Sequence, residues 1–137
     1  MSITVVGSSA FDDIETPRGS RKGIVGGSCI YFSLAASFKT KSNIVSVVGK
    51  DFPRKTFKIL NDRSISTDGL IEQEGKTFSW GGKYNSFSED PVTNFTNLNV
   101  FESFSPSIPE SYKESNSILF LANIDPVLQN KVVNLYH

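Results

Sequence analysis

Two adjacent carboxylates, Asp12 and Asp13, follow a short apolar run that begins at Ile3 and ends at Gly7. An apolar run closed by glycine predicts a buried strand. In open α/β sheets, ligands bind just beyond the carboxyl ends of the strands. A carboxylate can accept hydrogen bonds from two hydroxyl groups at once, so Asp12 is a candidate for binding a diol. Asp13 is an equal candidate by position, and either residue could instead cap a turn.

A glycine pair, Gly26 and Gly27, precedes a predicted helix with Ser28 as its expected N-cap. Four apolar residues then follow at the spacing of one helical face: Tyr31, Leu34, Ala35 and Phe38. Glycine lets a backbone approach a ligand closely, and a helix start offers free N–H groups. No Gly-Lys-Ser/Thr follows the pair, which excludes a P-loop. The glycines could also form a tight turn that binds nothing.

The region from about residue 77 to residue 100 differs in composition from the segments before it. Residues 77–84 and 93–100 are rich in aromatic and β-branched types and predict strands. Trp80, Lys83 and Tyr84 lie in the first of these strands and could contact a ligand. Trp80 and Tyr84 are the better candidates, because aromatic faces stack on sugar rings and bases. They could equally pack a small sheet or a subunit interface.

Asn123 follows the segment that most clearly predicts a buried strand, residues 118–122. From there its amide could bind a ligand at the edge of a sheet, or it could support the turn before Asp125. Asp125 and Pro126 predict the N-cap and first position of a last helix. Asp51 is expected to cap the helix that starts near Pro53.

These segments follow one another as strand, helix, strand, helix, a β-rich region, strand and helix. Such an order predicts a three-layer α/β core with a mostly parallel sheet and right-handed crossovers. The β-rich region, at about residues 70–100, is expected to project from that core as an inserted element.

Composition narrows the classes of function. The 137 residues carry 14 basic and 14 acidic side chains, so charge gives no case for nucleic acid or an acidic membrane as partner. One cysteine, Cys29, excludes an internal disulfide framework and a cysteine-based zinc site, and one histidine, His137, argues against a histidine-dependent triad or metal cluster. The chain has no apolar run of about 20 residues and no signal-peptide pattern at its start, so we expect a cytoplasmic protein.

Three patterns in order resemble the ribokinase-like (pfkB-type) family of carbohydrate and nucleoside kinases. They are Val5-Val6-Gly7-Ser8 with Asp12; Gly26-Gly27 with Ala35-Ala36; and Val47–Pro53 followed by Ile65–Leu70. Weaker similarity continues at Gly75–Trp80 and at Asn123–Pro126. The resemblance implies a ribokinase-like fold and an intact enzyme that transfers the γ-phosphoryl of ATP, with Mg²⁺, to a sugar hydroxyl.

The resemblance also assigns roles. It implies that Asp12, Gly26 and Gly27 form the substrate pocket and that the inserted strands, with Trp80 and Tyr84, form a lid over it. The family's Gly-Ala-Gly-Asp-like stretch supplies the catalytic base and an anion hole, and no such stretch occurs in this sequence. We therefore expect a truncated, N-terminal half of such a kinase: residues 1–137 would bind a small-molecule sugar or nucleoside and hold no catalytic residue, cofactor or metal.

Two positions depart from the family pattern. Ala10 and Tyr31 stand where the known sugar kinases often carry asparagine, so the sequence does not identify the sugar. A non-catalytic binding or assembly module derived from the same fold remains the alternative. An open strand edge and uncovered apolar helix faces further predict a homo-oligomer, formed through the β lid element.

Overall fold

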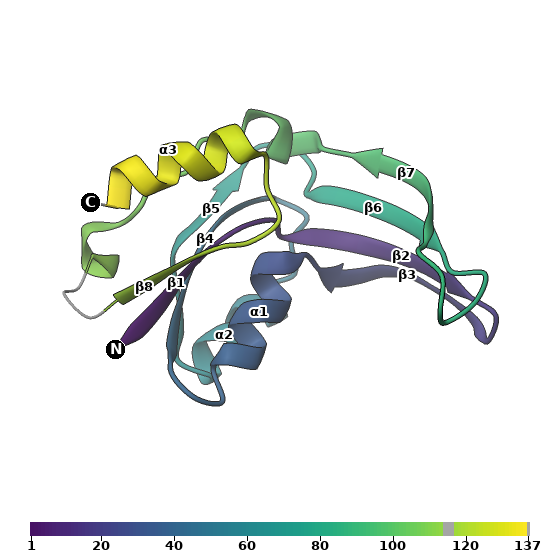
Figure 1. Ribbon diagram of the computed structural model, residues 1–137, viewed down its shortest axis with the longest axis horizontal. Helices are drawn as coiled ribbons and strands as arrows, with labels where there is room; N and C mark the ends of the chain where they lie inside the picture. Colours follow the sequence, from purple (N-terminus) through teal and green to yellow (C-terminus); the bar gives the residue numbers. More distant parts are fainter. Residues whose placement is uncertain (114–116, 137) are drawn as a thin grey trace.

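The fold contains two four-stranded sheets and the helices that pack on one of them (Figure 1). The computed structural model describes residues 1–113 and 117–136. The core sheet is wholly parallel in the order β5-β4-β1-β8. Its strands are β1 (Ser2–Val6), β4 (Lys41–Gly49), β5 (Ile65–Gln73) and β8 (Ser117–Leu121). The second sheet, in the order β3-β2-β6-β7, comprises β2 (Ala10–Thr16), β3 (Gly19–Gly26), β6 (Phe78–Lys83) and β7 (Val92–Asn97).

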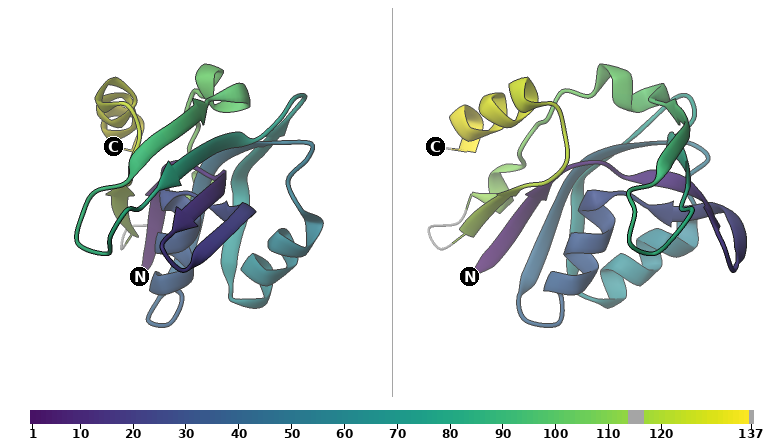
Figure 2. Two further views of the ribbon diagram at one scale, coloured as in Figure 1. Left: turned by 90° about the vertical axis from the view of Figure 1, so that its right-hand side faces the viewer. Right: turned by 45° about the vertical axis from the view of Figure 1, so that its right-hand side comes forward.

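Helices cover both faces of the core sheet, as the two further views in Figure 2 show. On one face lie α1 (Ser28–Ala36) and α2 (Arg54–Asp62). On the other lie α3 (Pro126–Tyr136) and two short 3₁₀ turns, η1 (Asn99–Ser103) and η2 (Glu110–Tyr112). The predicted three-layer α/β core with a mostly parallel sheet is confirmed.

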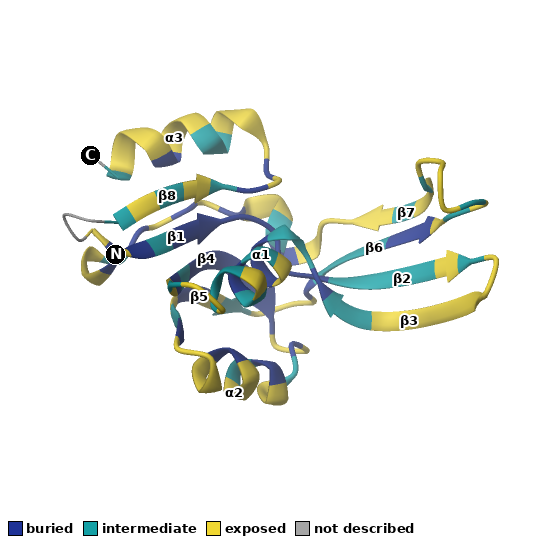
Figure 3. Cartoon of the chain, turned by 60° about the horizontal axis from the view of Figure 1, so that its bottom comes forward, coloured by how far each residue is buried: buried dark blue, intermediate teal, exposed yellow. Residues whose placement is uncertain are grey.

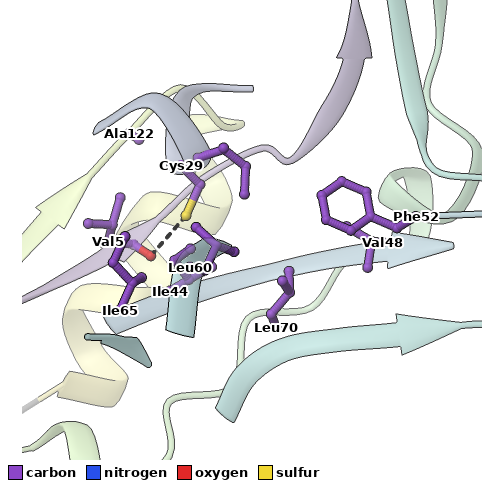
Figure 4. Packing of buried hydrophobic residues seen from close by; sticks show 10 residues of the cluster. Val5, Cys29, Ile44, Val48, Phe52, Leu60, Ile65, Leu70 and Ala122 are labelled. Carbon is purple, nitrogen blue, oxygen red and sulfur yellow. Dashed lines mark hydrogen bonds between the residues drawn. The ribbon is translucent and has the colours of Figure 1, made fainter. Parts of the chain in front are cut away.

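The core beneath α1 and α2 is apolar and closely packed around Cys29 (Figure 4). The Cys29 thiol is fully buried and donates a hydrogen bond to the carbonyl oxygen of Val5 at 3.3 Å. Burial raises the pKa of this thiol to about 12. Cys29 is thus a packing residue at the contact between α1 and β1.

Helix α1 does not bury the face that the spacing of its apolar residues predicts. Its buried side chains are Cys29, Ile30 and Ser33, while Tyr31 and Phe38 are exposed, and the helix ends at Ala36. Apolar residues lie all around this helix, so their spacing could not tell the inward face from the outward one.

The second sheet projects from the core (Figure 3), but its boundaries differ from the prediction. Residues 70–73 belong to β5 of the core, and half of the second sheet comes from the hairpin of residues 10–26. The two hairpins are each antiparallel and join through the parallel pair β2–β6. Residues 19–23 are exposed, which explains why this hairpin has the composition of a loop. We name the second sheet the lid sheet.

Strand β8 is an edge strand and not the fully buried strand that its composition predicts. Ile118 and Phe120 remain 49% and 37% exposed, whereas Leu119 and Leu121 pack on the side of α3. The cap of α3 is as predicted, because Oδ1 of Asp125 accepts the Val127 N–H at 2.7 Å.

Asp51 links the core to the lid sheet instead of capping α2. Its Oδ1 accepts the backbone N–H of Thr77 at 2.8 Å and the Thr77 hydroxyl at 2.7 Å. Thr77 Oγ1 in turn accepts the N–H of Gly49 at 3.0 Å. Helix α2 begins at Arg54 with Pro53 at its N-cap position and no side-chain cap. The Asp51 carboxylate therefore fixes the point at which the chain enters β6.

Candidate functional site

Asp12 lies within β2, in the part of the lid sheet next to the core. It stands opposite Trp80 of β6 and Ile24 of β3. Side chains directly opposite on paired strands share one face of a sheet, so Asp12 and Trp80 point the same way. Asp13, the next residue, faces the other way, and its Oδ1 accepts the Gly23 N–H at 2.7 Å. The structure thus separates two carboxylates that were equivalent candidates in the sequence.

The carboxylate of Asp12 occupies the space that a side chain at Gly26 would fill. A Cβ atom at Gly26 would overlap Oδ2 of Asp12 and lie 3.1 Å from Cε2 of Tyr31. The Asp12 carboxylate and the Tyr31 ring therefore converge over the bare α-carbon of Gly26. Tyr31 is 55% exposed, which leaves its ring open to a ligand.

Tyr31 is the site residue that the sequence analysis missed. It was considered only as a replacement for asparagine, whose hydrogen bonds a tyrosine does not make, and not as an aromatic surface. Its position in the first turn of α1, four residues after Gly27, was the signal that it faces the same space as the glycine pair.

Gly27 brings the start of α1 against the link between β1 and β2. Its φ of +93° is unfavourable for other residues, and a Cβ there would overlap the Ser8 carbonyl oxygen. Gly27, and not Ser28, occupies the N-cap position of α1. Ser8 satisfies the next two N–H groups, since its Oγ accepts from Ser28 at 3.2 Å and its carbonyl from Cys29 at 2.9 Å. The helix start therefore offers a ligand fewer donors than the sequence suggested.

Burial raises the pKa of the half-buried Asp12 above its ordinary value; the Gly27 backbone N–H opposes this effect and the charge of Asp13 adds to it. The Asp12 carboxylate is thus shielded from water on one side and accepts a hydrogen bond from the Gly27 N–H. Such a group can accept hydrogen bonds from ligand hydroxyls on its exposed side while the Gly27 N–H holds it on the other.

The Trp80 ring lies along the same face of the lid sheet and covers Gly82, where a Cβ would overlap the indole. Its Nε1 donates to Thr93 Oγ1 at 3.3 Å, which ties the ring to β7. Trp80 therefore lies on the face of the lid sheet that carries Asp12, with its ring over Gly82.

Tyr84 is not brought to this place, and the binding role predicted for Asn123 stays a prediction. The Tyr84 N–H donates to the Glu15 carbonyl at 2.8 Å, which sets Tyr84 four residues beyond Trp80, or about 13 Å along the strand. Asn123 is exposed and follows β8 at the carboxyl edge of the core sheet, next to the end of β1. The candidate site accordingly consists of Asp12, Gly26, Gly27 and Trp80, with Tyr31 added.

In the part of the chain that the structure describes, no three His, Cys, Asp or Glu side chains come together in a way that could hold a metal ion. His137 lies outside the described residues. No helix in residues 1–113 or 117–136 is long and apolar enough to cross a membrane.

The fold, with its projecting lid sheet, matches solved kinase structures. Fructokinase from Halothermothrix orenii superposes with a TM-score of 0.69 and 17% identity, over 99% of this chain and 52% of that chain. The chain has the ribokinase-like fold. The nucleoside kinase of Methanocaldococcus jannaschii, described as an archaeal member of the ribokinase family, gives 0.65 and 17%, over 98% and 48% of the two chains.

Ribokinase from Cryptococcus neoformans var. grubii serotype A, in complex with ADP, gives a TM-score of 0.67 and 16% identity, over 96% of this chain and 44% of that chain. The chain thus spans about half the length of these structures, and the resemblance seen in the sequence is confirmed at the level of the fold. No family model matches the chain, and no curated protein does.

Proposed function

We propose that this chain is the substrate-binding half of a kinase that phosphorylates a hydroxyl group of a sugar or nucleoside. The observation that carries the proposal is the placement of the Asp12 carboxylate over Gly26 beside the ring of Tyr31, on the sheet face that also carries Trp80. This arrangement stands at the junction of the core and the lid sheet in a chain with the ribokinase-like fold.

The chemistry of these groups suits a ring that carries hydroxyls. The ionised carboxylate can accept hydrogen bonds from two hydroxyl groups, and charge-assisted hydrogen bonds of this kind are stronger than neutral ones. The rings of Tyr31 and Trp80 offer aromatic surface on which the apolar face of a sugar or a base can pack. Holding the acceptor hydroxyl in place matters for this reaction, because phosphoryl transfer depends mainly on positioning and charge stabilisation.

The catalytic base and the MgATP site are assigned to a part of the intact enzyme that this chain does not contain. The sequence has no Gly-Ala-Gly-Asp-like stretch. The chain alone is therefore expected to bind substrate without transferring phosphate. A non-catalytic binding module would behave in the same way in isolation, and only the intact protein distinguishes the two.

We also propose that the protein is cytoplasmic and that copies associate through the lid sheet. Strands β3 and β7 form the two edges of this sheet, and unpaired edges favour pairing with another chain. Val92 on β7 is 55% exposed and adds apolar surface to its edge.

Calorimetry with a panel of sugars and nucleosides tests the binding proposal. The variant Asp12→Asn removes the charge and keeps the shape, and we expect at least a tenfold loss of affinity, about 1.4 kcal/mol. Asp13→Asn, on the other face, is the matched control and should bind as the unaltered chain does. Equal binding by all three proteins would remove Asp12 from the site.

A further inference from the structure

A hollow of about 330 Å³ lies further out on the lid sheet, at the turn between β2 and β3. Two arginines, Arg18 and Arg21, line it together with Ile14, Thr16 and Ile24. Two positive charges beside apolar side chains in a hollow of this size form a place for a small anionic group.

The hollow lies on the same face of the lid sheet as Asp12. Side chains alternate along a strand, so Ile14 shares the face of Asp12. Arg21 pairs with Ile14 across the hairpin, beyond an irregularity in the pairing between Asp12 and Ile14. Ile14 is two residues from Asp12, or about 7 Å along the strand. That separation is close to the span between a ring hydroxyl of a sugar and a substituent at its far end.

The two arginines that line the hollow are not neutralised by a neighbouring carboxylate in the described part of the chain. Among the residues that the structure describes, no carboxylate forms an ion pair with Arg18 or Arg21. Glu15 is paired with Lys83 at 2.9 Å. Arg18 instead lies 5.3 Å from the centre of the Phe87 ring, a cation–π contact that holds its side chain near the hollow.

From this arrangement we infer that the substrate carries an anionic group, which binds Arg18 and Arg21 while its hydroxyls bind Asp12. This inference rests on the proposed function and narrows its substrate class to a sugar phosphate or a sugar acid. A guanidinium suits both, because its planar donors match phosphate and carboxylate oxygens in pairs.

Titration of the chain with fructose, fructose 6-phosphate, gluconate and inorganic phosphate distinguishes a sugar phosphate from a sugar acid as the ligand. We expect at least one of the anionic sugars to bind at least tenfold more tightly than fructose, with a preference that weakens as salt is added. Equal affinities for fructose, fructose 6-phosphate and gluconate, or no binding of any of them, would overturn the inference. Inorganic phosphate alone should bind weakly, because it lacks the hydroxyls that Asp12 would hold.

The variants Arg18→Gln and Arg21→Gln should remove the preference for the anion. Lys22→Gln is the matched control, because it removes the same charge from the next residue of the strand. Lys22 borders a separate hollow with Asp13 and Glu15, which Arg21 also borders. If Lys22→Gln lost the preference to the same extent as both arginine variants, the preference would reflect the total positive charge of the hairpin. That result would contradict the assignment to Arg18 and Arg21.

The same titrations distinguish failure of this inference from failure of the proposed function. Binding of unphosphorylated sugar that depends on Asp12 and ignores both arginines would overturn the anion site alone. Binding of anionic sugars that depends on the arginines but not on Asp12 would support the anion site and overturn the proposed role of Asp12.

Discussion

The carboxylate of Asp12 lies across the bare α-carbon of Gly26, in space that any other residue at position 26 would fill. The two residues are neighbours through the pairing of β2 with β3, in which Gly26 stands opposite Ala10 and Asp12 opposite Ile24. Gly26 therefore acts on a ligand indirectly, by leaving room for the group that would bind it.

Gly26→Ala should destabilise the fold and displace the carboxylate. We expect a loss of about 1–3 kcal/mol in the free energy of unfolding, as for other overpacked sites, together with loss of substrate binding. Because the clash is with Oδ2 of Asp12, the cost should shrink when the same change is made in Asp12→Ala. Urea unfolding of the two single variants and the double variant measures this coupling, and additive effects would contradict the contact.

The stability of the chain should depend on pH through Asp12. Burial raises its pKa above the ordinary value of 3.8, so the folded state holds this proton more tightly than the unfolded state. Stability relative to Asp12→Asn should therefore fall as the pH rises from below 3.8 through the raised pKa. Urea unfolding of both proteins between pH 3 and 7 measures the difference. A difference that stays constant or grows with pH would contradict the raised pKa.

Cys29 should resist thiol reagents while the chain is folded. Its thiol is fully buried, with a pKa of about 12, and only the thiolate reacts. We expect labelling by a disulfide reagent at pH 8 to follow the rate of unfolding and to accelerate with urea. Fast labelling without denaturant would show that the contact between α1 and β1 opens readily.

Asp51→Ala should loosen the connection between the core and the lid sheet. The change leaves the Thr77 N–H and hydroxyl without their acceptor, which costs about 1–3 kcal/mol for buried donors. Hydrogen exchange should increase first in β6. The exposed Glu89 provides a control, and an effect of Glu89→Ala as large as that of Asp51→Ala would contradict this role.

Self-association should be sensitive to the edge of the lid sheet. Val92→Lys places a charge on the exposed edge strand β7, which opposes pairing between strands. Sedimentation should show an oligomer for the unaltered chain and a smaller species for the variant. A monomer at high concentration in the unaltered chain would refute the proposed association.

The sequence predicted the parts of the fold that local pattern determines. The apolar runs of β1 and β4 and the Asp125 cap of α3 depend on near neighbours only. From the sequence, residues 12–23 could be a loop or a short, exposed pair of strands, because polar residues without apolar alternation do not distinguish the two; the structure forms the strands. Ile118 and Phe120 looked buried because apolar composition does not show whether a strand lies at the edge of a sheet.

Position and residue type made Asp12, Gly26 and Gly27 separate candidates, but only the resemblance to a family joined them in one pocket. Their convergence depends on the pairing of β2 with β3 and on the direction in which α1 leaves Gly27. The separation of Asp12 from Asp13 likewise required the strand, since only alternation across a sheet places adjacent carboxylates on opposite faces.

NMR of the isotopically labelled chain, titrated with sugars, nucleosides and sugar phosphates, would locate a bound substrate directly. We predict that the largest shifts fall on the amides of Asp12 and Gly27 and on the rings of Tyr31 and Trp80, and that they disappear in Asp12→Asn but not in Asp13→Asn. Shifts confined to another surface, such as the hollow between η1 and α3 lined by Phe101 and Leu128, would contradict the proposed site. So would the absence of any shift at the highest soluble concentration of every compound.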